Sequence, residues 1–175
     1  MEKKFIDKLD TELYTEKFKK NSVIKLHHKK YINDKYAPAW KTLEFFTFGT
    51  MMYLYKNLKD KQLRQDIASQ YNIRNEKILK NYFDRIVEIR NLCAHGNVLF
   101  DHTLTQRLIN GPALKITNNS FRLYSAIKII QYVLKNISVN RAKEMEDEIN
   151  QLFKKFDNNL IISNLIKNFI IGKNN

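Results

Sequence analysis

Cysteine, glycine and proline are scarce in this chain, and each scarcity excludes a class of protein. Of 175 residues, only 1 is cysteine, 4 are glycine and 2 are proline. The single cysteine, Cys93, cannot form an internal disulfide framework or a cysteine-rich metal site, so we expect a reducing cytoplasmic setting and no metal or other cofactor. Turn-rich all-β architectures need more glycine and proline, so the composition favours helices.

Long apolar runs and acidic residues are also lacking. No apolar stretch reaches the length that spans a membrane, and the first five residues are not followed by the apolar region of a signal peptide, so no membrane partner is expected. Lys and Arg total 31 against 18 Asp and Glu, which gives a net charge of +13. Such an excess attracts polyanions, nucleic acid first among them. A general bias of composition would produce the same charge without a partner.

The residues that are abundant predict one helical domain over residues 1–175. Hydrophobic residues make up 43% of the chain, enough for a single core at this length. Apolar side chains recur at intervals of three and four residues, which is typical of amphipathic helices in a bundle. The expected helices cover residues 5–18, 40–58, a short segment after Asp60, 78–95 and, within a C-terminal part spanning 119–171, residues 121–137, 145–156 and 160–171. Residues 23–35 are expected to form either a short helix or an ordered linker.

Three local features refine this expectation. The segment 40–58 is expected to be one buried helix, with Gly49 near its middle at a close helix crossing. Gly96 is placed to stop the helix that begins near Ile78. Residues 97–118 contain Asn110-Gly111-Pro112 and are expected to form a long loop, and loops of this length in compact domains are often functional.

One short motif stands at the end of the most periodic helix: Arg90-Asn91-Leu92-Cys93-Ala94-His95. A second motif precedes it, with the spacing Pro38-x-Trp40, then Glu44, then Phe48-Gly49. Together they lie in a core region of residues 36–100. In their order and separation they resemble the Abi-like (abortive infection) branch of the HEPN ribonucleases.

The resemblance implies an all-α, HEPN-like helical bundle that cleaves RNA without a metal. It assigns Arg90, His95 and Asn91 to the catalytic site, and it implies a homodimer in which two copies of the motif face each other. It also implies a toxin role in anti-phage defence, with an antitoxin RNA or protein as a further partner. Only about 35 residues precede the Pro-x-Trp segment, fewer than in many members, and Gly96-Asn97 follow His95 in place of a second histidine.

The residue types suit this chemistry. A histidine can take a proton from the ribose 2′-hydroxyl or return one to the leaving oxygen. An arginine can hold two phosphate oxygens while negative charge develops. Positions five apart on a helix point about 140° away from each other. Arg90 and His95 would therefore share a site by reach, by the end of the helix, or across two subunits related by a two-fold axis.

Other residues carry secondary expectations. Glu44 interrupts an apolar run, so we expect it either to orient Arg90 or Asn91 or to face solvent. Lys29, Lys30 and Lys35 are candidate RNA-binding residues, with a solvated basic face as the alternative.

The motif itself also has alternative interpretations. In one of them Arg90 bonds helix-end carbonyls, Asn91 and His95 cap the helix, and Cys93 and Ala94 belong to the core. In another, the fold is a non-catalytic RNA-binding or interaction module. A DNA-binding regulator is disfavoured, because no helix-turn-helix with a basic recognition helix is evident.

Overall fold

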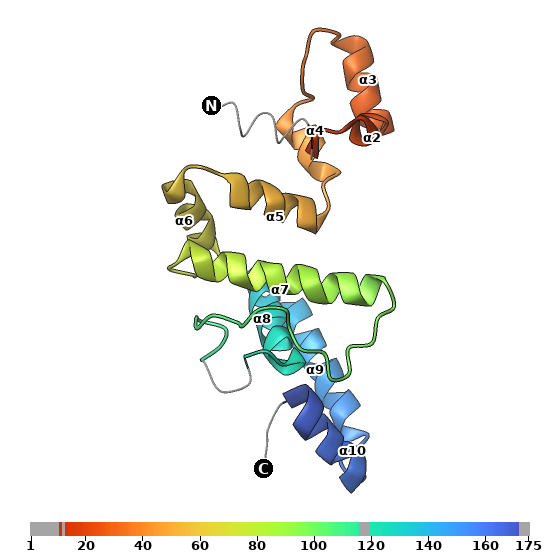
Figure 1. Ribbon diagram of the computed structural model, residues 1–175, viewed down its shortest axis with the longest axis vertical. Helices are drawn as coiled ribbons and strands as arrows, with labels where there is room; N and C mark the ends of the chain where they lie inside the picture. The colour runs from red at the N-terminus through yellow and green to blue at the C-terminus, as the bar shows by residue number, and fades with distance from the viewer. Residues whose placement is uncertain (1–10, 12, 116–119, 172–175) are drawn as a thin grey trace. The chain divides into compact units, whose positions relative to one another are not determined.

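The computed structural model describes residues 11, 13–115 and 120–171. Across these residues the regular elements are helices, and β-structure is limited to two isolated bridges, Thr103 with Arg122 and Gly111 with Leu114. The all-α prediction is therefore confirmed for this part of the chain. Contacts divide the chain into two compact units, Met1–Lys59 and Asp60–Asn175, and Figure 1 shows the helices of each. The single domain over 1–175 and the HEPN-like arrangement stay predictions.

The helices described in the first unit are short, and three of them begin at polar side-chain caps. They are α2 (Glu16–Lys19), α3 (Ser22–Lys30), α4 (Ala39–Glu44) and α5 (Phe48–Asn57). The side chains of Thr15 and Asn21 accept hydrogen bonds from first-turn N–H groups of α2 and α3. A small core forms around Tyr14, Ile24 and Ala37, and the Ala37 N–H donates to the Tyr14 hydroxyl at 2.7 Å. Phe5 and Leu9, at the start of the expected first helix, lie outside the described residues.

The prediction of one buried helix over residues 40–58 is wrong. The chain leaves the helix after Glu44, and Thr47 starts a new one by accepting a hydrogen bond from the Thr50 N–H at 3.1 Å. The segment is not uniformly buried either, since Trp40 is 69% exposed. Gly49 lies in the first turn of α5, so no helix crossing is needed to explain it. A local cap has overridden the apolar pattern here.

The second unit contains the longer helices. They are α6 (Lys61–Gln70), α7 (Glu76–Ala94), α8 (Leu123–Ile137), α9 (Val139–Lys154), α10 (Leu160–Leu165) and the π-helical η2 (Ile166–Ile171). Asp60 caps α6 as predicted, because its carboxylate accepts from the N–H groups of Gln62 and Leu63. Helix α9 begins six residues before the predicted start at Met145, since Ser138 both ends α8 and caps α9.

Helix α7 packs against α6 on one side and α8 on the other, and α8 packs against α9. The side chains of Leu79, Tyr82 and Ile129 are fully buried in this unit. Among the described residues, none of the helices is both long enough and apolar enough to cross a membrane. The motif lies at the C-terminal end of α7 (Figure 1).

The loop after α7 is fastened along that helix. The Asn81 side chain donates to the Arg107 carbonyl at 3.0 Å and accepts from the Ile109 N–H at 2.9 Å. At Gly111 an added Cβ would lie 2.5 Å from the Tyr82 hydroxyl, so only glycine permits this close approach. The loop prediction is confirmed as far as residue 115, while residues 116–118 lie outside the described part.

Candidate active site at the end of helix α7

A glycine-dependent cap ends α7 within the motif. Gly96 has a φ of +66°, in the left-handed region that favours glycine. The Asn97 N–H donates to the Leu92 carbonyl at 2.9 Å, and the Gly96 N–H donates to the Cys93 carbonyl at 3.2 Å. This pair of bonds is the Schellman motif, with His95 as the last residue of the helix end. The prediction that Gly96 stops the helix is confirmed.

The three predicted catalytic residues, Arg90, Asn91 and His95, are all exposed. Arg90 Nη1 donates to Asn91 Oδ1 at 3.1 Å, so the guanidinium is held at the side of the amide. The backbone N–H of His95 donates to the Asn91 carbonyl at 3.0 Å, which ties Asn91 to the helix end. Among the described residues, none forms a hydrogen bond with the His95 imidazole. The structure therefore joins Arg90 to Asn91 by a hydrogen bond, and in the described part of the chain no hydrogen bond joins Arg90 to the His95 imidazole.

This exposure bears on the alternative interpretation of the motif. Cys93 and Ala94 are exposed, so the expectation that they belong to the core is wrong. The Arg90 guanidinium bonds a side-chain oxygen of Asn91 rather than a helix-end carbonyl. His95 does end the helix, as that interpretation expects, but it does so through its backbone. Its imidazole remains open to solvent.

Sequence reasoning missed a polar network on α7 within about one and a half turns before the motif. Glu88 Oε2 lies 3.0 Å from Arg85 Nη1, and Glu88 Oε1 lies 3.1 Å from His102 Nε2. The same carboxylate accepts from the backbone N–H and the hydroxyl of Thr105, at 2.9 and 3.0 Å. Arg85 is only 6% exposed and also donates to the Thr105 hydroxyl. A buried charge needs such partners. The network holds the loop against α7 beside the motif.

One signal in the sequence could have found this network. Asn81, Arg85 and Glu88 recur at spacings of four and three residues, on one side of a helix whose remaining periodic positions are apolar. Polar residues on a buried stripe need partners from elsewhere in the chain. The long polar loop that follows α7 was the available source.

Glu44, the predicted positioning residue, belongs to the first unit, whereas Arg90 and Asn91 belong to the second. Its side chain is exposed at the end of α4. This exposure agrees with the solvent-facing alternative. The role of orienting Arg90 or Asn91 stays a prediction.

The predicted RNA-binding lysines lie in the first unit, and all three are exposed. Lys35 lines a hollow of about 280 Å³ whose other walls are Lys19, Lys25, His28 and Asp34. The Lys30 and Lys35 amines lie 5.4 and 5.2 Å from the ring centres of Tyr31 and Tyr36. Lys29 and Lys30 do not line the hollow. An RNA-binding role for the three lysines stays a prediction.

Histidines outside the motif are bound within the fold. His27 is buried, and its Nε2 lies 3.0 Å from Asp34 Oδ2, while His28 Nε2 lies 2.7 Å from the Tyr14 hydroxyl. In the described part of the chain, no three His, Cys, Asp or Glu side chains are grouped as a metal site would require. These histidines are structural, which leaves His95 as the histidine with an open imidazole.

A comparison with protein families decides the relationship that the two motifs indicate. The profile of the Abi-like protein family matches residues 1–101 of this chain, more than half of its length. The chain belongs to the Abi-like family. The match includes both the Pro38 to Gly49 segment and the Arg90 to His95 motif. Neither the curated proteins nor the solved structures contained a match to the chain. In this Abi-like protein the helices α8 to η2 follow the matched region.

Proposed function

We propose that this Abi-like protein is a metal-independent endoribonuclease whose active site is the C-terminal end of α7. The observation that carries the proposal is the joint exposure of Arg90, Asn91 and His95 at one helix end, in a chain of net charge +13. Family membership supports it, because the matched residues include the whole motif. Held by Asn91, the guanidinium is ready to receive a phosphate.

The proposed reaction divides between the His95 imidazole and the Arg90 guanidinium. The His95 imidazole takes the proton from a ribose 2′-hydroxyl, whose oxygen then attacks the neighbouring phosphorus. The P–O bond to the 5′-oxygen breaks, and that oxygen leaves with a proton from an imidazolium. The Arg90 guanidinium holds the non-bridging phosphate oxygens as negative charge develops on them. The products are a 2′,3′-cyclic phosphate and a 5′-hydroxyl end.

A second subunit would supply the acid when the first supplies the base. Arg90 and His95 point about 140° apart on their helix, so one motif alone aligns them poorly. In a two-fold dimer the same surface meets itself, and each His95 can stand opposite the other. We therefore include a homodimer in the proposal. An antitoxin RNA or protein that blocks the exposed helix end is its expected regulator.

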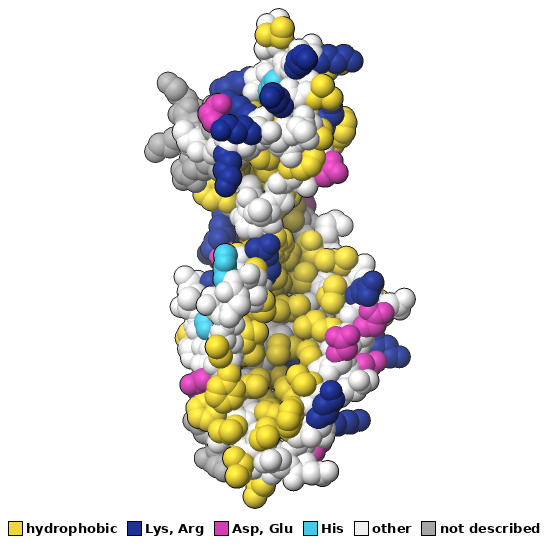
Figure 2. Space-filling model, turned by 90° about the vertical axis from the view of Figure 1, so that its right-hand side faces the viewer, with side chains coloured by type: hydrophobic (Ala, Val, Ile, Leu, Met, Phe, Trp, Pro, Cys, Tyr) yellow, Lys and Arg dark blue, Asp and Glu magenta, His cyan; other side chains and the backbone are white. Residues whose placement is uncertain are grey.

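An apolar face beside the motif supports the dimer. Val98 and Phe100, just after His95, are 76% and 49% exposed. Figure 2 shows hydrophobic side chains gathered on this side of the second unit. Phe100 also borders a hollow of about 240 Å³ whose lining is wholly apolar, with Phe156 and Ile166 among its walls. Two copies with a charge of +13 each would repel least where they meet over such an uncharged surface.

Cleavage is tested with purified protein and single-stranded RNA in EDTA. The proposal expects cyclic-phosphate ends, and it expects Arg90→Ala and His95→Ala each to lower the rate by about a hundredfold or more. Arg141→Ala, at an exposed arginine on α9, is the matched control and should leave the rate unchanged. Binding without cleavage by the unaltered protein would contradict the enzyme and favour the non-catalytic module.

The dimer is tested with Val98→Asp, which places a charge on an exposed position of the apolar face. Sedimentation should show the unaltered protein as a dimer and the variant as a monomer with little cleavage activity. Leu63→Asp, at a residue that is 44% exposed on α6, is the control with equal charge. A monomeric protein with full activity would overturn the composite site.

A further inference from the structure

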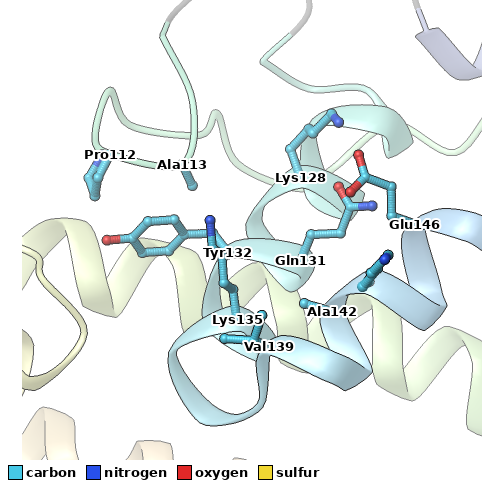
Figure 3. A pocket seen from close by; sticks show the side chains of 10 residues that line it. Pro112, Ala113, Lys128, Gln131, Tyr132, Lys135, Val139, Ala142 and Glu146 are labelled. Atoms are coloured by element: carbon cyan, nitrogen blue, oxygen red, sulfur yellow. The ribbon is translucent and has the colours of Figure 1, made fainter.

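A second hollow in the same unit gathers positive charge away from the motif. It has a volume of about 340 Å³ and lies between α8 and α9, beneath the loop at Pro112 and Ala113 (Figure 3). Lys128 and Lys135 reach it from α8, and Lys143 reaches it from α9. Two helices and a loop thus converge on it, which distinguishes it from a flat basic face. We call it the lysine groove.

The lysines of the groove are not neutralised by the protein. Lys128 and Lys135 are seven residues apart, so they lie on the same side of α8, two turns from each other. No carboxylate in the described part of the chain forms an ion pair with Lys128, Lys135 or Lys143. Glu146 is the one acidic side chain of the lining, and Figure 3 shows it on the rim beside Lys128 and Gln131. The groove therefore carries a net positive charge.

An aromatic ring forms one wall of the groove. The Tyr132 hydroxyl donates to the Tyr71 carbonyl at 2.8 Å, which fixes the ring in place. Pro112, Ala113 and Ala142 add apolar surface around it. A groove that combines lysines with an aromatic face suits single-stranded nucleic acid, because the cations contact phosphates while a base packs on the ring.

We infer that the lysine groove binds the phosphate backbone of single-stranded RNA, as a site separate from the cleavage centre. The inference rests on the proposed function for its ligand class. The loop that covers the groove contacts α7 where Gly111 meets Tyr82. Tyr82 precedes His95 by 13 residues, which is about 20 Å along the helix axis. That distance corresponds to roughly six nucleotides at the stacked spacing of about 3.4 Å. The groove would hold a strand several nucleotides from the scissile linkage.

The test measures binding apart from cleavage. In an Arg90→Ala background, the affinity for a fluorescein-labelled single-stranded RNA is followed by anisotropy at several salt concentrations. The test variant is Lys128→Ala, Lys135→Ala and Lys143→Ala combined. The control removes the same charge elsewhere in this unit through Lys154→Ala, Lys155→Ala and Lys167→Ala, all at exposed positions.

If the groove holds three phosphates, its loss should lower the slope of log affinity against log salt by about 2. Raising salt from about 50 to about 200 mM should then lower the RNA affinity of the Arg90→Ala background protein roughly twentyfold more than that of the groove variant. The control should keep the steeper slope. Conversely, Glu146→Gln should tighten binding, because it removes the acidic group of the groove. A circular dichroism melt checks that each variant is folded.

Equal losses in groove and control variants would overturn the inference, because net charge alone would then explain binding. Tight binding of a mononucleotide, with no added affinity for the strand, would overturn it too. The result is separable from the enzyme proposal. If the unaltered protein fails to cleave RNA in EDTA but the groove variant loses RNA affinity selectively, the groove stands and the nuclease does not. If cleavage occurs and the groove variant binds RNA normally, the nuclease proposal stands and the groove does not.

Discussion

Replacing Gly96 tests the backbone geometry that ends α7 at the motif. An alanine there would have to adopt a φ of +66°, which costs an L-residue with a Cβ about 1 to 2 kcal/mol. No steric cost is added, because a Cβ at Gly96 meets no heavy atom within 4 Å. Gly96→Ala should therefore lower the free energy of unfolding by about 1 to 2 kcal/mol. Gly96→Asn should cost less, since asparagine tolerates this conformation.

The assay is urea denaturation followed by circular dichroism. With a slope of about 2 kcal/mol per molar urea, Gly96→Ala should lower the midpoint by about 0.7 M. Gly111→Ala gives a contrasting case, because its Cβ would lie 2.5 Å from the Tyr82 hydroxyl and 2.8 Å from Ile78 Cγ2. There the cost arises from overpacking, about 1 to 3 kcal/mol. Tyr82→Phe should reduce the cost of Gly111→Ala, because it removes the hydroxyl that the new Cβ meets. It should leave the cost of Gly96→Ala unchanged.

Two results would refute this reasoning about Gly96. If alanine and asparagine at position 96 cost the same, the left-handed φ is not the cause of the loss. If Gly96→Ala costs nothing, α7 does not end in the Schellman cap that the bonds from Gly96 and Asn97 define.

Three further outcomes are expected. Glu88→Gln should lower the free energy of unfolding by about 3 kcal/mol, because it leaves the buried Arg85 guanidinium unneutralised. Glu144 gives a control, because it forms an exposed ion pair with Arg141 at 2.8 Å, and Glu144→Gln should cost less than about 1 kcal/mol in the same urea titration. Asp60→Ala should cost about 1 kcal/mol through loss of the α6 cap, and an unchanged midpoint would contradict that role. Burial raises the pKa of the Tyr82 hydroxyl, so its stabilising contribution is complete below pH about 10 and is lost as pH rises through the folded-state pKa. Thermal melts above pH 10 should show a smaller loss for Tyr82→Phe than for the unaltered protein.

Helix positions in the second unit could be predicted because their signals are local. The Asp60 cap, the periodic apolar residues of α7 and the stop at Gly96 each depend on residues within a few positions of one another. Where two local signals competed, the prediction was wrong. The apolar run from residue 40 to 58 favoured one helix, but the Thr47 cap divided it, and burial could not be judged without knowing what covered Trp40.

The residues of the candidate site could be predicted from the sequence, but the side chains that surround them could not. The identities of Arg90, Asn91 and His95 follow from the sequence, and so does the α7 end on which they lie. Their surroundings do not. Glu88 binds His102 and Thr105 across 14 and 17 residues, and the lysine groove joins α8, α9 and a loop. Such partners are set by how the chain returns on itself, which no spacing rule describes.

By itself the sequence determined that this protein is helical, basic and built around an Arg-Asn-x-x-x-His motif at a helix end, because periodicity, charge and caps are properties of short stretches. Only the tertiary structure decided that the motif is exposed, that the buried Arg85 pairs with a partly buried Glu88, and that three unneutralised lysines meet in one groove. The physical reason is that burial and electrostatic pairing depend on distances in space, and these arise only when distant segments pack together.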